Sequence, residues 1–217
     1  EEGRWDHKGE FYQFEGVEIV PKPVQDPLPV YVACFSKPTL DMTTRYGYGM
    51  SIAPFAAGLS FGGVDKQVAA YREGCEANGH TPGPVNSSYF LHLASTPAEE
   101  HAARERQIRF FRENAAPTMK TAAKGKNKSY EYWHGWADKV TSMKPEDLKP
   151  GSVLLGSPEQ VSEAVAKIES EGIEEIGLYI NIGLKGPQQT KDEMQQFMEE
   201  VAPHFDGPHN ALSRAAE

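Results

Sequence analysis

The sequence has 217 residues, of which 39% are hydrophobic, and it carries a formal net charge of −9. This composition provides enough apolar side chains for one sizeable core, and the length fits one domain or two. The acidic balance argues against a nucleic-acid or membrane-surface partner, because both require a positively charged patch.

Residues 1–29 are predicted to form a hairpin and an extended connector. The segments 11–14 and 17–20 are rich in aromatic and β-branched residues and flank Glu15-Gly16, which is typical of a hairpin turn. Prolines then stand at positions 21, 23, 27 and 29. Such spacing favours an extended backbone and interrupts regular structure.

The rest of the chain alternates between strands and helices. Short apolar runs predict strands, and apolar residues at spacings of three and four predict helices. The expected strands are 30–35, 49–53, 88–94 and 176–182, each followed by a helix over 38–46, 64–77, 97–114 and 190–201. A further helix is expected at 158–171, with Ser157 as its cap. Residues 115–151 form an insertion before the last strand, and 206–217 a flexible tail.

Continuous apolar strands that alternate with helices predict an α/β fold with a parallel sheet covered by helices. A closed (β/α)8 barrel requires eight strand–helix units, and this chain provides four. From these residues alone, the fold is either an open doubly wound sheet or half of a barrel.

Nothing in the sequence indicates a membrane span, a signal peptide or a metal site. The two cysteines, Cys34 and Cys75, both lie inside apolar patterns, so we expect them in the core and not in a disulfide. A reducing, cytoplasmic location follows as the expectation.

Several blocks occur in an order that is familiar from one family. They are "VPKPVQDPLPVYVA", "SKPT" and "YGYGM", followed later by "LLGSPEQVSEAVAKIESEGIEEIGLYINIG" and "DEMQQFMEEVAPHF". In these blocks the chain resembles the luciferase-like monooxygenases, flavin-dependent enzymes on a TIM-barrel scaffold. The resemblance covers nearly the whole chain.

The resemblance implies that the four strands are strands five to eight of a (β/α)8 barrel. Residues 1–205 would then be the carboxyl-terminal portion of one barrel domain, with the insertion at 115–151. The first four strands are absent from this sequence. We therefore expect a portion of a longer enzyme, or a half-barrel that another polypeptide completes, because an isolated half would expose apolar sheet edges.

Two hydroxyl residues, Ser36 and Thr39, stand at the corner where the first of these strands gives way to a helix. A helix start offers free backbone N–H groups and partial positive charge, which suits a phosphate. Local sequence alone favours the simpler interpretation, in which Ser36 is only an N-cap and Thr39 only a first-turn residue. In the resembling family this corner holds the phosphate of FMN, which implies cofactor contacts for Ser36, Thr39 and the adjacent Phe35. Many members have an acidic or small residue where Phe35 stands.

Other candidate site residues lie on the later strands. Ala53 ends the second strand and is a candidate cofactor contact, whereas Met50 is expected in the core. His92 on the third strand is a candidate general acid or base, although a lone histidine on a strand is more often structural. Asn181 and Gly183, at the end of the last strand, are candidates for the substrate pocket or for a simple turn.

The insertion contains the aromatic residues Tyr132, Trp133 and Trp136. Long excursions between barrel elements often form lids or pocket walls, so these aromatics are candidates for an apolar substrate wall. The alternative is an amphipathic helix that packs on the barrel or on a partner subunit.

The resemblance implies an oxidoreductase in which reduced FMN and dioxygen oxidise a small, apolar organic substrate. It also implies a flavin reductase that supplies the reduced flavin, and a homo- or heterodimer. Two alternatives stay open: a deazaflavin-dependent oxidoreductase on the same scaffold, and a non-catalytic subunit that stabilises a catalytic partner.

Overall fold

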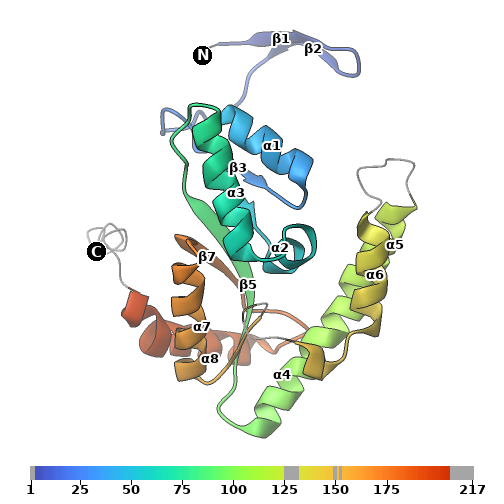
Figure 1. Ribbon diagram of the computed structural model, residues 1–217, viewed down its shortest axis with the longest axis vertical. Coiled ribbons are helices and arrows are strands. Elements are labelled where there is room, and N and C mark those ends of the chain that lie inside the picture. Colours follow the sequence, from blue (N-terminus) through green and yellow to red (C-terminus); the bar gives the residue numbers. More distant parts are fainter. Residues whose placement is uncertain (1–2, 125–131, 149–150, 152, 206–217) are drawn as a thin grey trace. The chain divides into compact units, whose positions relative to one another are not determined.

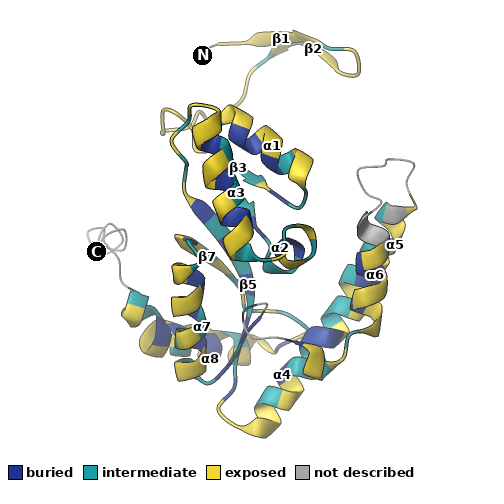
Figure 2. Ribbon diagram, in the orientation of Figure 1, coloured by how far each residue is buried: buried dark blue, intermediate teal, exposed yellow. Residues whose placement is uncertain are grey.

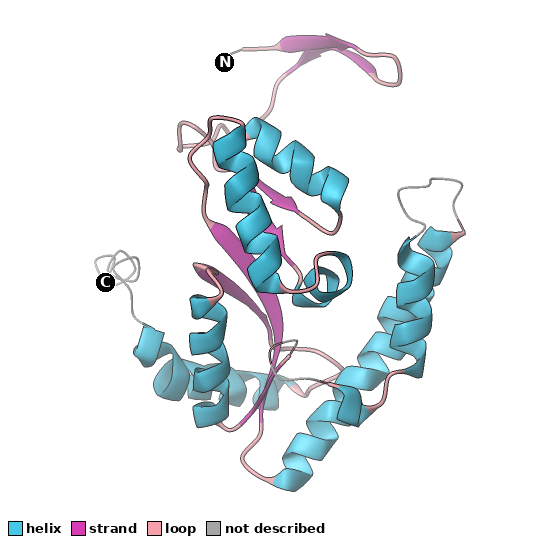
Figure 3. Ribbon diagram, viewed as in Figure 1, coloured by secondary structure: helices cyan, strands magenta, loops and turns pink. Residues whose placement is uncertain are grey.

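A computed structural model describes residues 3–124, 132–148, 151 and 153–205. The chain divides into two compact units, Glu1–Val30 and Tyr31–Glu217. Figures 1 and 3 show the helices and strands. The tail predicted at 206–217 and part of the 115–151 insertion lie outside the described residues.

The first unit contains an antiparallel hairpin that begins earlier in the chain than predicted. The predicted first segment, 11–14, overlaps the second strand of the observed hairpin. Strand β1 (Trp5–Lys8) pairs with β2 (Gln13–Val17). Glu15-Gly16 therefore lies inside β2 and is not the turn. Gly16 has a φ of 63° and donates its N–H to Asp6 Oδ1 at 2.7 Å, while the ladder shifts register opposite this position. The positive φ at Gly16 thus marks an irregularity within the strand.

The second unit holds a parallel sheet and its helices. Its strands are β3 (Tyr31–Ala33), β4 (Gly49–Ile52), β5 (Val85–Leu93), β6 (Leu154–Gly156) and β7 (Glu175–Tyr179). The helices are α1 (Lys37–Tyr46), α2 (Pro54–Ser60), α3 (Val64–Ala77), α4 (Pro97–Phe110), α5 (Ala116–Ala123), α6 (Tyr132–Ser142), α7 (Pro158–Ser170) and α8 (Pro187–Gln196). Shorter turns are the π-helical η1 (Phe111–Ala115) and η4 (Phe197–Val201), and the 3-10 turns η3 (Pro145–Asp147) and η5 (Ala202–Phe205).

The sheet winds in one direction. β3 pairs with β4, β4 with β5, and β5 with both β7 and, at its end, the short β6, all parallel. Along β3, β4, β5 and β7 the spatial order follows chain order. Right-handed crossovers that always step to the same side place every helix on one face of a sheet. A doubly wound sheet reverses direction partway and is covered on both faces. The strand order therefore favours the barrel type of winding over the doubly wound alternative.

The two faces of the sheet differ in burial, because buried and partly buried residues alternate along β5. Figure 2 colours each residue by its burial. Alternate residues of β5, namely Val85, Ser87, Tyr89 and Leu91, are completely buried toward the helices. The intervening residues are only partly buried. On β7 the corresponding outward residue, Tyr179, is 53% exposed. The face away from α1, α3 and α7 is thus only partly covered within the described chain, where Phe90 packs against Phe110 and Phe111.

Most of the predicted helices are confirmed, because their ends carry strong local signals. Helix α3 spans the predicted residues 64–77. Ser157 caps α7 in a capping box with Gln160, as expected. Gly47 ends α1 with a φ of 67°, a conformation that glycine adopts at little cost. Cys34, Cys75 and Met50 are buried in the core as predicted.

Several elements were not predicted, among them helix α2, which follows β4 directly, and the three-residue strand β6, which pairs with the end of β5. Both are too short to show a clear periodicity. Among the described helices, none has the length and apolar character that crossing a lipid bilayer demands.

Candidate active site

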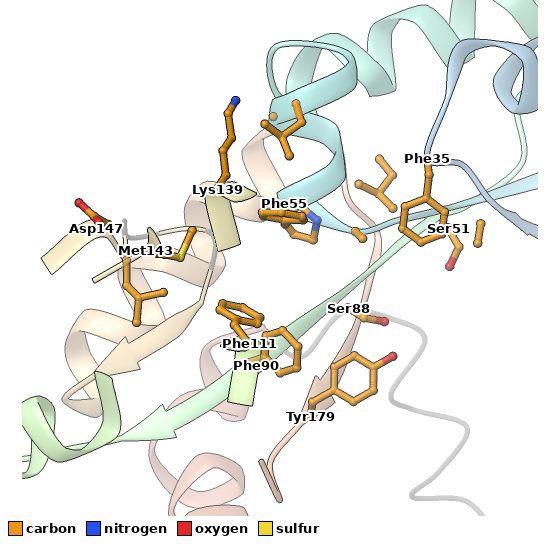
Figure 4. Close-up of a pocket in the computed structure, with 17 residues that line it drawn as sticks. Phe35, Ser51, Phe55, Ser88, Phe90, Phe111, Lys139, Met143, Asp147 and Tyr179 are labelled. Carbon is orange, nitrogen blue, oxygen red and sulfur yellow. The ribbon is translucent and has the colours of Figure 1, made fainter. Parts of the chain in front are cut away.

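A cavity of about 480 Å³ opens on this partly covered face of the sheet. Its floor is made by residues from four parallel strands. Ala33, Phe35, Ser51, Ala53 and Tyr179 lie at or near the carboxyl ends of their strands, and Ser88 and Phe90 lie in the middle of β5. Figure 4 labels Phe35, Ser51, Ser88, Phe90 and Tyr179 of this floor, together with Phe55 and Phe111. The carboxyl ends of parallel strands are where α/β barrels place their active sites.

Strand register explains why these residues meet. Ala33 lies opposite Ser51, and Phe90 lies opposite Tyr179. Because side chains alternate along a strand, residues in matching register on neighbouring parallel strands point to the same face. The cavity therefore follows directly from the strand pairing.

Aromatic rings form much of the cavity wall. The ring of Phe90 lies 5.5 Å from Phe111 and 5.4 Å from Tyr179, measured between centroids. Phe55, at the start of α2, meets Trp136 of α6 edge-to-face at 5.3 Å. Such contacts hold flat, apolar surfaces in fixed orientations. The wall therefore suits a flat or apolar ligand.

Polar groups line the cavity at two places. Ser51 and Ser88 lie on the sheet floor, and the Ser51 hydroxyl donates to Asn86 Oδ1. Lys139 of α6 and Asp147 of η3 lie at the other end (Figure 4). The remaining lining is largely apolar, which is the usual character of a small-molecule site.

Next to the cavity, the corner between β3 and α1 carries the paired hydroxyls. Ser36 Oγ and Thr39 Oγ1 are hydrogen-bonded to each other at 3.0 Å, and both residues are half-buried. The Ser36 side chain makes no capping bond to α1, although Ser36 occupies the N-cap position. The preceding residue, Phe35, lines the cavity, whereas Ser36 and Thr39 are not among its lining residues.

The corner is held from behind by two side chains. Gln67 of α3 is completely buried and donates Nε2–H to the Cys34 carbonyl at 2.8 Å. Ser60 at the end of α2 donates its hydroxyl to the Phe35 carbonyl at 2.8 Å. These two bonds fix the backbone that carries Phe35 and Ser36.

The charge at the start of α1 is favourable to an anion. No acidic residue stands in the first turn of α1. Lys37 forms an ion pair with Asp41 at 3.1 Å and is largely exposed. The partial positive charge of the helix start is therefore not neutralised by a carboxylate in the first turn.

His92 lies apart from the aromatic cavity. It is completely buried, and its Nε2–H donates to Gln107 Oε1 at 2.8 Å. Burial, reinforced by the positive charge of Lys185, lowers the pKa of His92 to about 4. His92 instead lines a separate polar cavity of about 440 Å³ between α4 and α8. The prediction that it acts as an acid or base stays a prediction.

The other predicted pocket residues are placed as follows. Asn181 and Gly183 lie after β7, outside the cavity lining; Asn181 is exposed, and Gly183 packs against Arg106. Trp136 is buried and supports Phe55. The side chains of Tyr132 and Trp133 lie outside the described residues.

Sequence reasoning missed several lining residues, notably Phe55, Phe111 and Tyr179. Tyr179 had a usable signal, because it lies two residues before the predicted pocket residue Asn181 in the predicted strand 176–182 and would share its face. Phe55 belongs to the unpredicted helix α2. Phe111 opens a π-helical turn that no sequence pattern indicates.

Comparison with known sequences gives a consistent family. The model of the luciferase-like monooxygenase family matches residues 1–175. The chain is 24% identical over 218 residues to an alkanal monooxygenase alpha chain of Photobacterium leiognathi, covering 92% of this chain and 58% of that protein. It is 26% identical over 199 residues to an FMNH2-dependent dimethylsulfone monooxygenase of Pseudomonas putida, covering 90% and 51%. The chain thus spans about half the length of these curated relatives.

Solved structures share the fold. A monooxygenase of Streptomyces bottropensis superimposes with a TM-score of 0.68 at 22% identity, covering 94% of this chain and 57% of that one. An F420-dependent secondary alcohol dehydrogenase superimposes with a TM-score of 0.59 at 13% identity, covering 93% and 56%. With the family model matching most of its length, this chain belongs to the luciferase-like monooxygenase family.

Proposed function

We propose that this chain is the FMN-anchoring and substrate-enclosing part of a flavin-dependent monooxygenase. The enzyme would use reduced FMN and dioxygen to oxidise a small, apolar organic substrate. One observation carries the proposal: the hydroxyl pair of Ser36 and Thr39 at the start of α1, beside a cavity with aromatic walls. The FMNH2 dependence named for the Pseudomonas relative supports the choice of cofactor.

The residues present fit a flavin phosphate. Two hydroxyls 3.0 Å apart can donate to one phosphate group, and the free N–H groups of the helix start add to them. In this assignment the alcohols exchange their mutual hydrogen bond for bonds to the phosphate. Phe35 and Ala53, which both line the cavity, would then contact the rest of the cofactor.

The chain's own residues supply binding, orientation and exclusion of water. When bound, reduced FMN supplies the electrons with which dioxygen is activated, so the difficult chemistry belongs to the cofactor. Phe55, Phe90 and Phe111 form the apolar surfaces that keep water out and shape the substrate site. The hydroxyls of Ser51, Ser88 and Tyr179 are the polar groups on the sheet side that can orient a ligand.

The proposal includes the rest of the enzyme. We assign β3, β4, β5 and β7 to strands five to eight of a closed barrel, whose preceding half covers the open sheet face. A flavin reductase would supply the reduced FMN, and the enzyme would act as a homo- or heterodimer. Both cysteines are free and buried, which accords with a reducing cytoplasm.

The test is a comparison of FMN with riboflavin, which lacks the phosphate, on the enzyme that contains this chain. We expect Ser36→Ala combined with Thr39→Val to weaken FMN binding by about tenfold to a hundredfold per lost hydroxyl, since hydrogen bonds to charged groups contribute about 1.5–3 kcal/mol. Riboflavin affinity should not change. Ser162→Ala, which removes a hydroxyl bonded to the Pro158 carbonyl of α7, is the matched control. Equal losses for both flavins would refute the phosphate assignment.

A deazaflavin cofactor is the second candidate, favoured by the structural likeness to the F420-dependent dehydrogenase. The absorbance spectrum of the bound cofactor separates the two. A non-catalytic subunit is the third candidate. It gains support if the longer protein neither binds flavin nor consumes oxygen while a partner chain does both.

A further inference from the structure

One face of α2 contributes three residues to the aromatic cavity: Phe55, Gly58 and Leu59. Positions three and four apart lie on the same side of a helix, so this face is turned toward the cavity. Phe55 and Leu59 bring large apolar side chains to the lining, and Gly58 between them brings none. A gap in the lining therefore lies at Gly58.

Glycine at this position is not explained by the fold. A Cβ built on Gly58 would meet no heavy atom within 4 Å, and its φ is not positive. By contrast, a Cβ on Gly74 would come within 2.8 Å of Thr44 Cγ2. Glycine is also the least favourable helix residue after proline. Gly58 is exposed, so what it supplies is open space at the edge of the cavity and not a required backbone conformation or close approach.

The surroundings of this volume are apolar. Met143 and Leu148, from the segment after α6 and η3, line the same cavity as Phe55 and Phe111. Figure 4 shows Phe55 between the sheet floor at Phe35 and Ser51 and the end at Met143. The free volume thus continues a cavity whose walls favour hydrocarbon.

We propose that Gly58 is a specificity-determining residue, whose missing side chain lets an extended apolar substrate, such as a long alkyl chain, fit along α2. This inference rests on the proposed substrate role of the cavity. A larger residue at position 58 shortens the cavity without disturbing the sheet floor or the Ser36–Thr39 corner. Short substrates are then still accepted, and long ones are excluded.

The experiment measures binding of straight-chain alcohols, which are unreactive probes, to the enzyme that contains this chain. Calorimetric titration with butanol, octanol and dodecanol is carried out for the wild type and for Gly58→Leu. Each methylene group kept out of an apolar site weakens binding by about fourfold, so losing room for two of them weakens dodecanol binding by about tenfold or more. Butanol affinity is expected to stay unchanged.

Gly135→Leu is the matched control, because Gly135 is also a helical glycine whose Cβ would meet no heavy atom within 4 Å, and it does not line the cavity. Gly58→Ala serves as a milder variant and should shift the chain-length preference in the same direction. The proposal is overturned if dodecanol binding falls equally in Gly135→Leu, if butanol binding falls as much as dodecanol binding, or if the wild type binds none of the alcohols. A parallel FMN titration separates the two proposals: failure of the wild type to bind FMN contradicts the flavin function alone.

Discussion

At the scale of single residues, the cofactor corner depends on a buried amide. Gln67 is completely buried and donates to the Cys34 carbonyl, one residue before the cavity-lining Phe35. A buried carbonyl that loses its hydrogen-bond donor destabilises the folded state, because it is no longer hydrated by water either. The corner is therefore positioned by a residue that lies 31 positions after Ser36 and was not expected from the sequence.

Replacing Gln67 with methionine keeps the volume and removes the donor. We expect Gln67→Met to lower the free energy of unfolding by about 1–3 kcal/mol, measured by urea denaturation. The matched control is Gln188→Met, because Gln188 makes an exposed bond to Asp192 at 2.8 Å. Similar stability for both variants would show that the buried bond has little effect.

His92 gives the protein a predictable acid response. Its pKa of about 4 in the folded state lies below the ordinary value of 6.5, so the unfolded chain binds the proton first as the pH falls. Stability contributed by the neutral, buried imidazole is thus complete above about pH 6.5 and is lost toward pH 4. At about 1.4 kcal/mol per pKa unit, the loss reaches roughly 3 kcal/mol.

The comparison is with His92→Gln, which cannot titrate. Denaturation curves between about pH 7 and about pH 4.5 should show a steeper loss of stability in the wild type than in the variant. Parallel curves for the two proteins would mean that folding does not shift the pKa of His92.

At the scale of elements, a buried ion pair holds the segment after β7 against the end of β5. Lys185 is paired with Glu193 of α8 and donates to the Leu91 carbonyl at 2.8 Å, while the Glu193 carboxylate accepts from Leu93 N–H at 3.4 Å. Both bonds reach the end of β5. Burial lowers the pKa of Lys185, and Glu193 opposes this shift.

Removing one partner leaves the other charge buried and unpaired. We expect Lys185→Met to destabilise the protein by about 3–5 kcal/mol, and Lys185→Met with Glu193→Leu to restore part of that loss. Thermal unfolding of the single and double variants is the measurement. A double variant that is less stable than the single variant would contradict this account.

The sequence correctly predicted the elements whose ends carry capping residues or glycine stops. Helices α3 and α7 were placed well because apolar spacing, Ser157 and nearby glycines define them. The cavity was predictable only where it follows strand ends, as at Phe35 and Ala53. Phe55, Phe111 and Gln67 act through tertiary packing, and no local pattern in the sequence shows which distant backbone a side chain will meet.

At the scale of the whole molecule, the sheet has one face that is only partly covered in the described chain. Tyr31 and Tyr179 on its outer strands are 39% and 53% exposed. Exposed apolar surface of this kind promotes association. If the preceding half of a barrel covers this face in the enzyme, the chain alone should behave differently from the longer protein.

We expect the isolated chain to bind a hydrophobic dye and to self-associate in sedimentation experiments, and the longer protein to do neither to the same extent. Tyr179→Lys in the isolated chain should reduce the association. An isolated chain that is monomeric, cooperatively folded and dye-free would instead support a self-sufficient sheet.

The π-helical turn η1 sets the direction of the helix that follows it. A π turn contains one residue more than an α turn, so it rotates everything that follows by about 100° relative to a regular helix. Phe111 is the first residue of that turn and lines the cavity. Deleting a single residue such as Glu113 would restore an unbroken α-helix and rotate α5 about the helix axis. The parts of the cavity wall before and after the turn would then move apart, although no side chain that lines the cavity is changed.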